Sequence, residues 1–148
     1  MRIRAKGQRL QAAFTLAETV VSMALTGLMV SGIVSGFLQS ARQAEWSAYS
    51  YAAQAQALWR LEQVRAAAWD PLRFPQVDDV KQSNFTNRVE ILDIPGSGGN
   101  ITYATNKTFI TDISTAPPLR LIVVECTWRF PNRGLYTNIV RTYRTTDQ

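Results

Sequence analysis

Phe14-Thr15-Leu16-Ala17-Glu18 opens a long apolar run, and no charged residue occurs in residues 19–41. A helix that crosses a bilayer needs about 20 predominantly apolar residues, so this run is long enough to span a membrane. Glu18 stands at the head of the run. A carboxylate at the mouth of a membrane helix is costly, and its presence therefore calls for a physical explanation.

The segment upstream of this run is short and basic, with Arg2, Arg4, Lys6 and Arg9. Positive charge beside a membrane helix favours the cytoplasmic side, so the sequence predicts a cytoplasmic N-terminus and a C-terminal domain across the membrane. Without residues 1–13, the chain has twelve basic and eleven acidic residues. The overall charge of +5 therefore gives no indication of a nucleic-acid surface.

The 148 residues leave room for one anchor and about one small globular domain. Histidine is absent and Cys126 is the only cysteine, which excludes Ser-His and Cys-His catalysis and an internal disulfide. The adjacent Asp78 and Asp79 are only a weak sign of calcium. We therefore predict no catalytic residue, no metal site and no cofactor.

A basic leader, a small residue, Phe-Thr-Leu-x-Glu and a span-length helix together resemble the N-terminus of type IV prepilins and pseudopilins. The resemblance implies that a prepilin peptidase cuts between Ala13 and Phe14 and that Phe14 is then N-methylated. Ala13 stands where the family most often has glycine. The resemblance also implies that Glu18 pairs with the new α-amine of a neighbouring subunit and sets the stagger of assembly. On position alone, Glu18 could instead reach the cytoplasmic headgroups.

Small residues recur four apart within the predicted span, at Gly32 and Gly36 and at Ser31 and Ser35, and Gly27 lies further upstream. Such residues let two helices approach closely in lipid. We predict that Gly27, Gly32 and Gly36 take part in helix packing, although glycine is also common in membrane helices generally.

Residues 41–69 continue the helical signal, because they are rich in good helix formers. Arg42, Gln56, Glu62 and Gln63 are predicted to point away from an apolar face, and the helix is predicted to end near residues 69–71, before a proline. The predicted apolar face consists of Trp46, Ala53, Ala57, Leu61, Val64 and Ala68.

The remainder of the chain is predicted to form an antiparallel sheet. The predicted segments are a loop at 72–85, strands at 88–94, 101–113, 119–130 and 135–145, and turns at 95–100 and 131–134. In the third strand, Ile122, Val124, Cys126, Trp128 and Phe130 alternate onto one face. Cys126 is therefore predicted to be inert packing.

The predicted fold is α+β and pilin-like, with one long N-terminal helix packed on a small antiparallel sheet. Its parts are a cleaved leader at 1–13, a membrane and assembly helix at 14–40, and a periplasmic domain at 41–148. The Trp-Asp helix end and the closing hairpin look most like minor pilins of the PilV type and the minor I-type pseudopilins of type II secretion.

These observations predict a non-catalytic subunit of a type IV pilus or a type II secretion pseudopilus. It would begin as a single-pass inner-membrane protein and then enter the filament. Its predicted partners are other pilin or pseudopilin subunits, the prepilin peptidase and the inner-membrane assembly platform. An uncleaved, membrane-anchored binding or sensor protein is the alternative, and it needs no cut at Ala13. An envelope enzyme released by signal cleavage near Gly36 or Ala41 is a third class.

Overall fold

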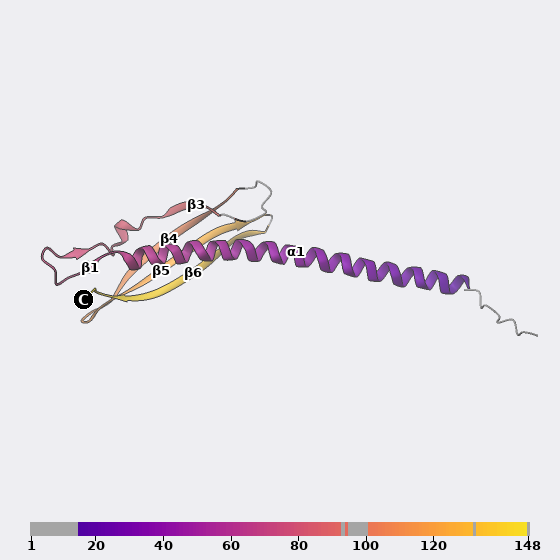
Figure 1. Ribbon diagram of the computed structural model, residues 1–148, viewed down its shortest axis with the longest axis horizontal. Coiled ribbons are helices and arrows are strands. Elements are labelled where there is room, and N and C mark those ends of the chain that lie inside the picture. Colours follow the sequence, from indigo (N-terminus) through magenta and orange to yellow (C-terminus); the bar gives the residue numbers. More distant parts are fainter. Residues whose placement is uncertain (1–14, 93, 95–100, 132, 148) are drawn as a thin grey trace, which may run out of the picture. The chain divides into compact units, whose positions relative to one another are not determined.

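The computed structural model describes residues 15–92, 94, 101–131 and 133–147. The chain divides into two compact units, Met1–Arg42 and Gln43–Gln148. The predicted leader at 1–13 and the predicted turn at 95–100 lie outside the described residues. Figure 1 shows the order of the elements, from helix α1 to strand β6.

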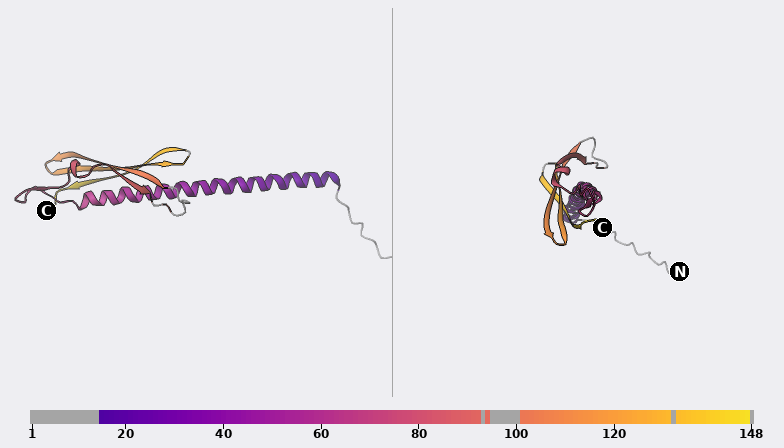
Figure 2. Two further views of the ribbon diagram at one scale, coloured as in Figure 1. Left: turned by 90° about the horizontal axis from the view of Figure 1, so that it is seen from above. Right: turned by 90° about the vertical axis from the view of Figure 1, so that its left-hand side faces the viewer.

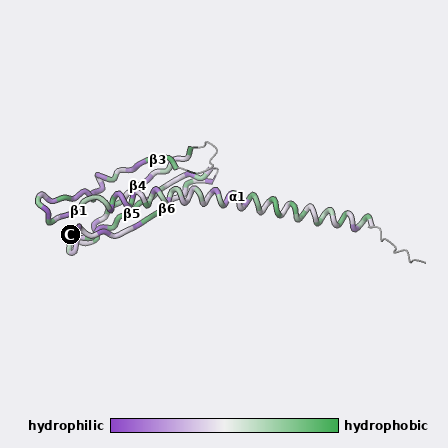
Figure 3. The backbone as a smooth tube through the Cα atoms, viewed as in Figure 1, coloured by the Kyte–Doolittle hydropathy of each residue, from purple (hydrophilic) through white to green (hydrophobic). Residues whose placement is uncertain are grey.

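Helix α1 runs from Leu16 to Ala66, close to the prediction at its start. It is long and apolar enough to cross a membrane, and its hydrophobic residues concentrate in the N-terminal half (Figure 3). The side chains of residues 16–46 are exposed. The helix ends three residues before the predicted Trp69, because Trp69 already pairs with Asp78 in a small β ladder.

The main sheet has four antiparallel strands in the order β3-β4-β5-β6, which confirms the predicted antiparallel sheet. Its strands are β3 Arg88–Leu92, β4 Thr102–Thr115, β5 Pro118–Phe130 and β6 Gly134–Thr145. The segment predicted as a loop at 72–85 is more structured than expected. It contains strand β2 (Val77–Asp78), which pairs with β1 (Trp69–Asp70), and a 3₁₀ helix at Gln82–Asn84.

The core of the second unit lies between one face of this sheet and the C-terminal half of α1 (Figure 2). The predicted alternation in β5 is confirmed, since Ile122, Val124, Cys126, Trp128 and Phe130 are all buried. The buried residues of α1 are Tyr49, Ala53, Ala57, Arg60, Leu61 and Val64.

The predicted face of the helix is wrong at both ends. Ala68 lies beyond the helix and is exposed. Trp46 stays 39% exposed, although its ring centroid lies 6.5 Å from that of Trp128 and 6.1 Å from that of Tyr136. Tyr49 is buried instead and stacks on Trp128 at 5.7 Å. Aromatic rings reach further than a helical wheel drawn through Cα positions indicates.

Strand β4 is longer than its neighbour β3, which pairs with it only as far as Asn106. The side-chain amide of Gln82 covers part of the remaining edge. It donates to the Thr108 carbonyl at 2.6 Å and accepts from the Ile110 backbone N–H at 3.0 Å. One amide thereby replaces the pairing that a neighbouring strand would supply, and blunts an exposed sheet edge.

Candidate functional site

The first residues of α1 form a capping box. The Glu18 carboxylate accepts hydrogen bonds from the Thr15 backbone N–H at 2.8 Å and the Thr15 hydroxyl at 2.9 Å. The Glu18 N–H in turn donates to Thr15 Oγ1 at 3.3 Å. This reciprocal pattern satisfies donors that a helix start leaves unpaired. The Thr-x-x-Glu spacing signals such a box, and the sequence analysis missed it.

Glu18 therefore has an intrachain role, and its assembly role stays a prediction. Its carboxylate is exposed and is bonded to Thr15, the residue that follows Phe14 in the chain. The predicted processing residues Ala13 and Phe14 lie outside the described residues.

The three predicted packing glycines lie on α1 with open space around them. A Cβ added at Gly27, Gly32 or Gly36 would meet no atom within 4 Å. No contact in the described part of this chain therefore requires a small residue at these positions. Large apolar side chains close to the glycines, such as Leu28, Ile33 and Phe37, are exposed as well.

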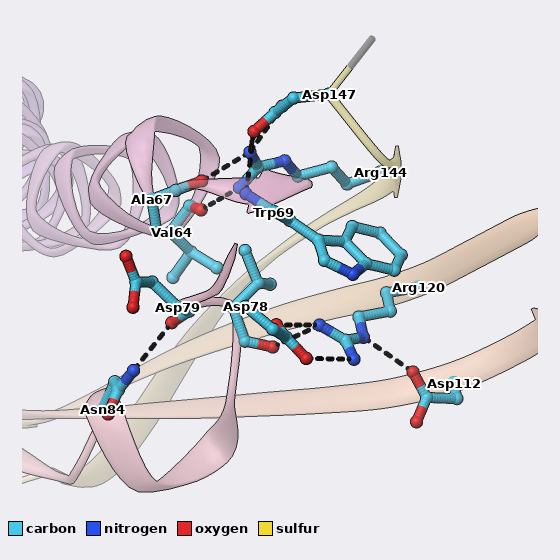
Figure 4. A network of polar contacts seen from close by, with 11 residues as sticks. Val64, Ala67, Trp69, Asp78, Asp79, Asn84, Asp112, Arg120, Arg144 and Asp147 are labelled. Atoms are coloured by element: carbon cyan, nitrogen blue, oxygen red, sulfur yellow. Dashed lines mark hydrogen bonds and ion pairs between the residues drawn. The ribbon is translucent and has the colours of Figure 1, made fainter. Parts of the chain in front are cut away.

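A network of polar contacts joins the C-terminal end of α1 to the end of the chain (Figure 4). The guanidinium of Arg144 donates to the carbonyls of Val64 and Ala67 and forms an ion pair with Asp147 at 2.9 Å. The last carbonyls of a helix lack partners within the helix, so Arg144 acts as a side-chain cap. The Asp147 carboxylate accepts from the Trp69 backbone N–H at 2.8 Å, which holds its pKa below the usual value.

Arg120 forms the second half of this network. Its guanidinium binds both carboxylate oxygens of Asp78, at 2.6 and 2.9 Å, and one oxygen of Asp112 at 2.7 Å. It also donates to the Val80 carbonyl at 2.8 Å and lies 4.1 Å from the Trp69 ring centroid. A bidentate pair of this kind has both geometric specificity and strength.

Both carboxylate oxygens of Asp78 therefore accept hydrogen bonds from Arg120. Its hydrogen bonds with Arg120 hold the pKa of Asp78 below its ordinary value, and they raise the pKa of Arg120. Among the described residues, no three His, Cys, Asp or Glu side chains gather as metal ligands do. Asp78 and Asp79 thus have a structural setting, in which Asp79 contributes its backbone groups to Ala68 and Asn84.

Polar residues also lie beneath the helix. Gln56, predicted to point away from the domain, instead donates to the Ile91 carbonyl at 2.7 Å and accepts from Asn106 at 3.3 Å. Asn106 is 1% exposed and also donates to Glu90 at 3.2 Å. The sequence prediction was wrong for Gln56 because periodicity assigns an amide to water unless a buried partner is known.

The sulfur of Cys126 lies in this same layer. Burial raises the pKa of its thiol to about 11, and Glu90 adds to the effect. A thiol that stays protonated is a poor nucleophile, so this environment does not activate Cys126. Its burial beside Val124 and Trp128 fits the predicted packing role.

Comparisons of this chain with protein-family models, with curated proteins and with solved structures return no match. The function is therefore inferred from the residues and contacts of this chain. Two features stand out for that purpose: the capped helix start, where Glu18 is the one charge in residues 14–41, and the polar network at the helix end.

Proposed function

We propose that this chain is a structural subunit, of the minor kind, of a type IV pilus or a type II secretion pseudopilus. The observation that carries the proposal is the position of Glu18. It is the one charged residue in residues 14–41, and it heads an exposed helix that follows a basic leader. The Phe-Thr-Leu-x-Glu motif and the α+β fold with a long N-terminal helix support the same proposal.

Cleavage between Ala13 and Phe14 by a prepilin peptidase would create a positive α-amine one residue before Thr15. A carboxylate packed among apolar helices is stable only with a charge partner. The amine of a neighbouring subunit supplies that partner, so charge pairing selects one axial stagger between helices. The open space at Gly27, Gly32 and Gly36 allows helices to approach closely in the assembled bundle.

In this proposal the chain enters the inner membrane with its N-terminus cytoplasmic and its C-terminal domain periplasmic. The peptidase then trims and methylates it, and an assembly platform adds it to a filament of pilin or pseudopilin subunits. The chain serves as a structural subunit of this filament and catalyses no reaction.

One alternative has specific support. The capping box satisfies the Glu18 carboxylate within its own chain, and an uncleaved membrane-anchored binding or sensor protein needs no other partner for it. The two proposals differ in whether the leader is removed.

The test is the intact mass and N-terminal residue of the protein from membranes with and without a prepilin peptidase. A chain that begins at methylated Phe14 only when the peptidase is present is the expected result. A chain that begins at Met1 in both membranes would overturn the proposal and favour the anchored protein. A start beyond Leu38 would show that the helix is discarded as a signal.

A further inference from the structure

The two edges of the main sheet differ in whether side chains cover their backbone groups. At the β3 edge, the amide of Gln56 on α1 donates to the Ile91 carbonyl at 2.7 Å. Where β4 extends past β3, Gln82 bonds to the Thr108 carbonyl and to the Ile110 N–H. Such side chains occupy backbone groups to which a further strand would otherwise bind. This edge of the sheet is therefore capped.

Strand β6 forms the opposite edge of the sheet (Figure 1). All of its residues, Gly134–Thr145, pair with β5 without a register shift. In an antiparallel ladder, alternate residues direct their N–H and C=O groups away from the paired strand. Apart from the ladder, the described residues provide one hydrogen bond to the β6 backbone, from the Thr142 hydroxyl to the adjacent Tyr143 carbonyl at 3.4 Å. The described chain thus leaves a long row of donors and acceptors open at this edge.

The chemistry of this edge selects an extended peptide segment. A backbone N–H or C=O that loses its water on binding needs a new hydrogen-bond partner. A β-strand supplies donors and acceptors at the required spacing, and extended segments add to exposed sheet edges in this way. Native proteins usually blunt a long, regular edge with proline, lysine, a bulge or a covering group. Strand β6 contains neither proline nor lysine, and its register is unbroken.

The outer face of β6, which is turned away from α1, determines which side chains suit the added strand. Leu135, Ile139 and Tyr143 lie on this face and are 67%, 44% and 65% exposed. Thr137 and Arg141 lie between them, because residues two apart on a strand share a face. Cross-strand neighbours on one face pack directly against each other. Apolar residues of an added strand would therefore cover the three apolar side chains.

The charges on this outer face are predominantly basic. Lys107 lies directly across from Glu125, whereas the partners of Arg129 and Arg141 in the β5–β6 ladder are apolar. Within the described residues, Arg129 and Arg141 take part in no ion pair. Three cations and one carboxylate give the described part of this face a net charge of +2. Electrostatic complementarity therefore favours an acidic residue opposite Arg141.

We propose that β6 accepts an extended segment of a partner protein as a fifth strand of the main sheet. The segment places apolar residues opposite Leu135, Ile139 and Tyr143, and it places Asp or Glu opposite Arg141. Its backbone bonds to the open N–H and C=O groups of β6. This docking site belongs to the folded domain and is the same whether or not the leader is removed, so it goes beyond the proposed filament role.

Binding of a designed peptide to the full-length protein in detergent micelles tests this site. The probe is fluorescein-labelled Val-Thr-Glu-Thr-Val-Thr-Thr-Thr-Val. In antiparallel pairing it sets valine opposite Tyr143, Ile139 and Leu135, and glutamate opposite Arg141. Fluorescence anisotropy should show saturable binding with a dissociation constant below ~1 mM. Two further probes have backbone N-methyl groups at alternate residues, one set for each edge of the peptide, and only the set that faces β6 should abolish binding.

Charge variants test the recognition of the acidic residue. Arg141→Glu should weaken binding of the probe by roughly tenfold or more, because two carboxylates then face each other. A probe with lysine in place of glutamate should bind Arg141→Glu more tightly than the parent. Arg73→Glu, in the exposed segment between β1 and β2, is the matched control and should bind the probe like the parent. The melting temperature of Arg141→Glu should match the parent, because the side chain of Arg141 is exposed and forms no ion pair in the described chain.

Absence of probe binding to the parent at ~1 mM would overturn the inference. Equal binding of the two N-methylated probes would exclude strand pairing, and unchanged binding in Arg141→Glu would exclude the charge pairing. Binding of phosphatidylglycerol vesicles without binding of the probe would assign the basic face to a membrane surface instead. Self-association of the parent in sedimentation, dissolved by the probe, would show that a second copy supplies the strand and would overturn a separate partner. Cleavage before Phe14, measured by intact mass, reports on the proposed filament role separately.

Discussion

Glu18 has two possible roles, and a small set of substitutions separates them. In the structure its carboxylate caps the helix through Thr15, whereas in the proposed filament it neutralises the α-amine of Phe14 on a neighbouring subunit. Glu18→Gln removes the charge but retains a side-chain oxygen that can complete a capping box. Thr15→Ala removes the hydroxyl that donates to Glu18 at 2.9 Å and retains the charge.

The two roles predict different magnitudes. Loss of the Thr15 cap costs about 1 kcal/mol, which is about fivefold in an equilibrium constant. Loss of the charge would leave an amine unpaired among apolar helices, and breaking such a pair lowers assembly by roughly a hundredfold or more. We therefore expect Glu18→Gln and Glu18→Leu to nearly abolish incorporation into filaments. Thr15→Ala should reduce incorporation by less than roughly tenfold.

The assay compares the amount of this chain in sheared, pelleted filaments with the amount left in membranes. Intact mass first establishes that each variant is cleaved before Phe14. Thr26→Ala is the matched control, because its hydroxyl donates to the Ser22 carbonyl at 2.8 Å within the same helix. Full incorporation of Glu18→Gln, together with loss in Thr15→Ala, would refute charge pairing and leave Glu18 as a helix cap.

Three further predictions concern the folded domain. Arg120→Met should lower the free energy of unfolding by about 2–4 kcal/mol, because it leaves the Asp78 carboxylate and the Val80 carbonyl without their partner; a change below about 0.5 kcal/mol in urea denaturation would contradict this. Arg120 lowers the pKa of Asp78 in the folded chain from its ordinary value of 3.8. The ion pair therefore contributes its full stabilisation above pH 3.8, and this stabilisation is lost as the pH falls through the lower pKa of the folded chain. The melting temperature should thus fall more steeply with decreasing pH in the parent protein than in Asp78→Asn. Equal dependence of the melting temperature on pH in the two proteins would count against a stabilising Arg120–Asp78 ion pair. At about pH 8, close to the pKa of an ordinary thiol, Cys126 should resist alkylation in the folded chain and react once denaturant exposes it. Rapid labelling of the folded chain would show that the thiol is not buried.

Local patterns were sufficient to predict the long helix and the four strands of the main sheet. The absence of charge in residues 19–41 and the helix formers that follow predicted α1, which begins at Leu16. Alternation in 119–130 predicted both β5 and its buried face. These signals depend on spacing between neighbours in the chain, and such spacing is visible without a fold.

Contacts between distant residues escaped sequence reasoning. Gln56 was assigned to solvent, yet it bonds to Ile91 and Asn106. Asp78 was weighed as a weak calcium ligand, yet it binds an arginine that lies 42 residues further along the chain. Strand β1 was predicted as the end of the helix and strand β2 as loop, because two-residue strands leave no periodic signal.

The sequence by itself determined where the helix starts, that its first half suits a membrane, and that the strand at 119–130 has an apolar face. It also holds the Thr15–Glu18 capping signal, because that contact spans three residues of one helix. Only the tertiary structure decided that Arg120 and Arg144 close the end of the domain and that the described residues leave the edge of β6 without a cap. Arg144 donates to the carbonyl of Val64, which lies 80 residues earlier in the chain. Tertiary packing, and not local propensity, brings together two residues so far apart in sequence.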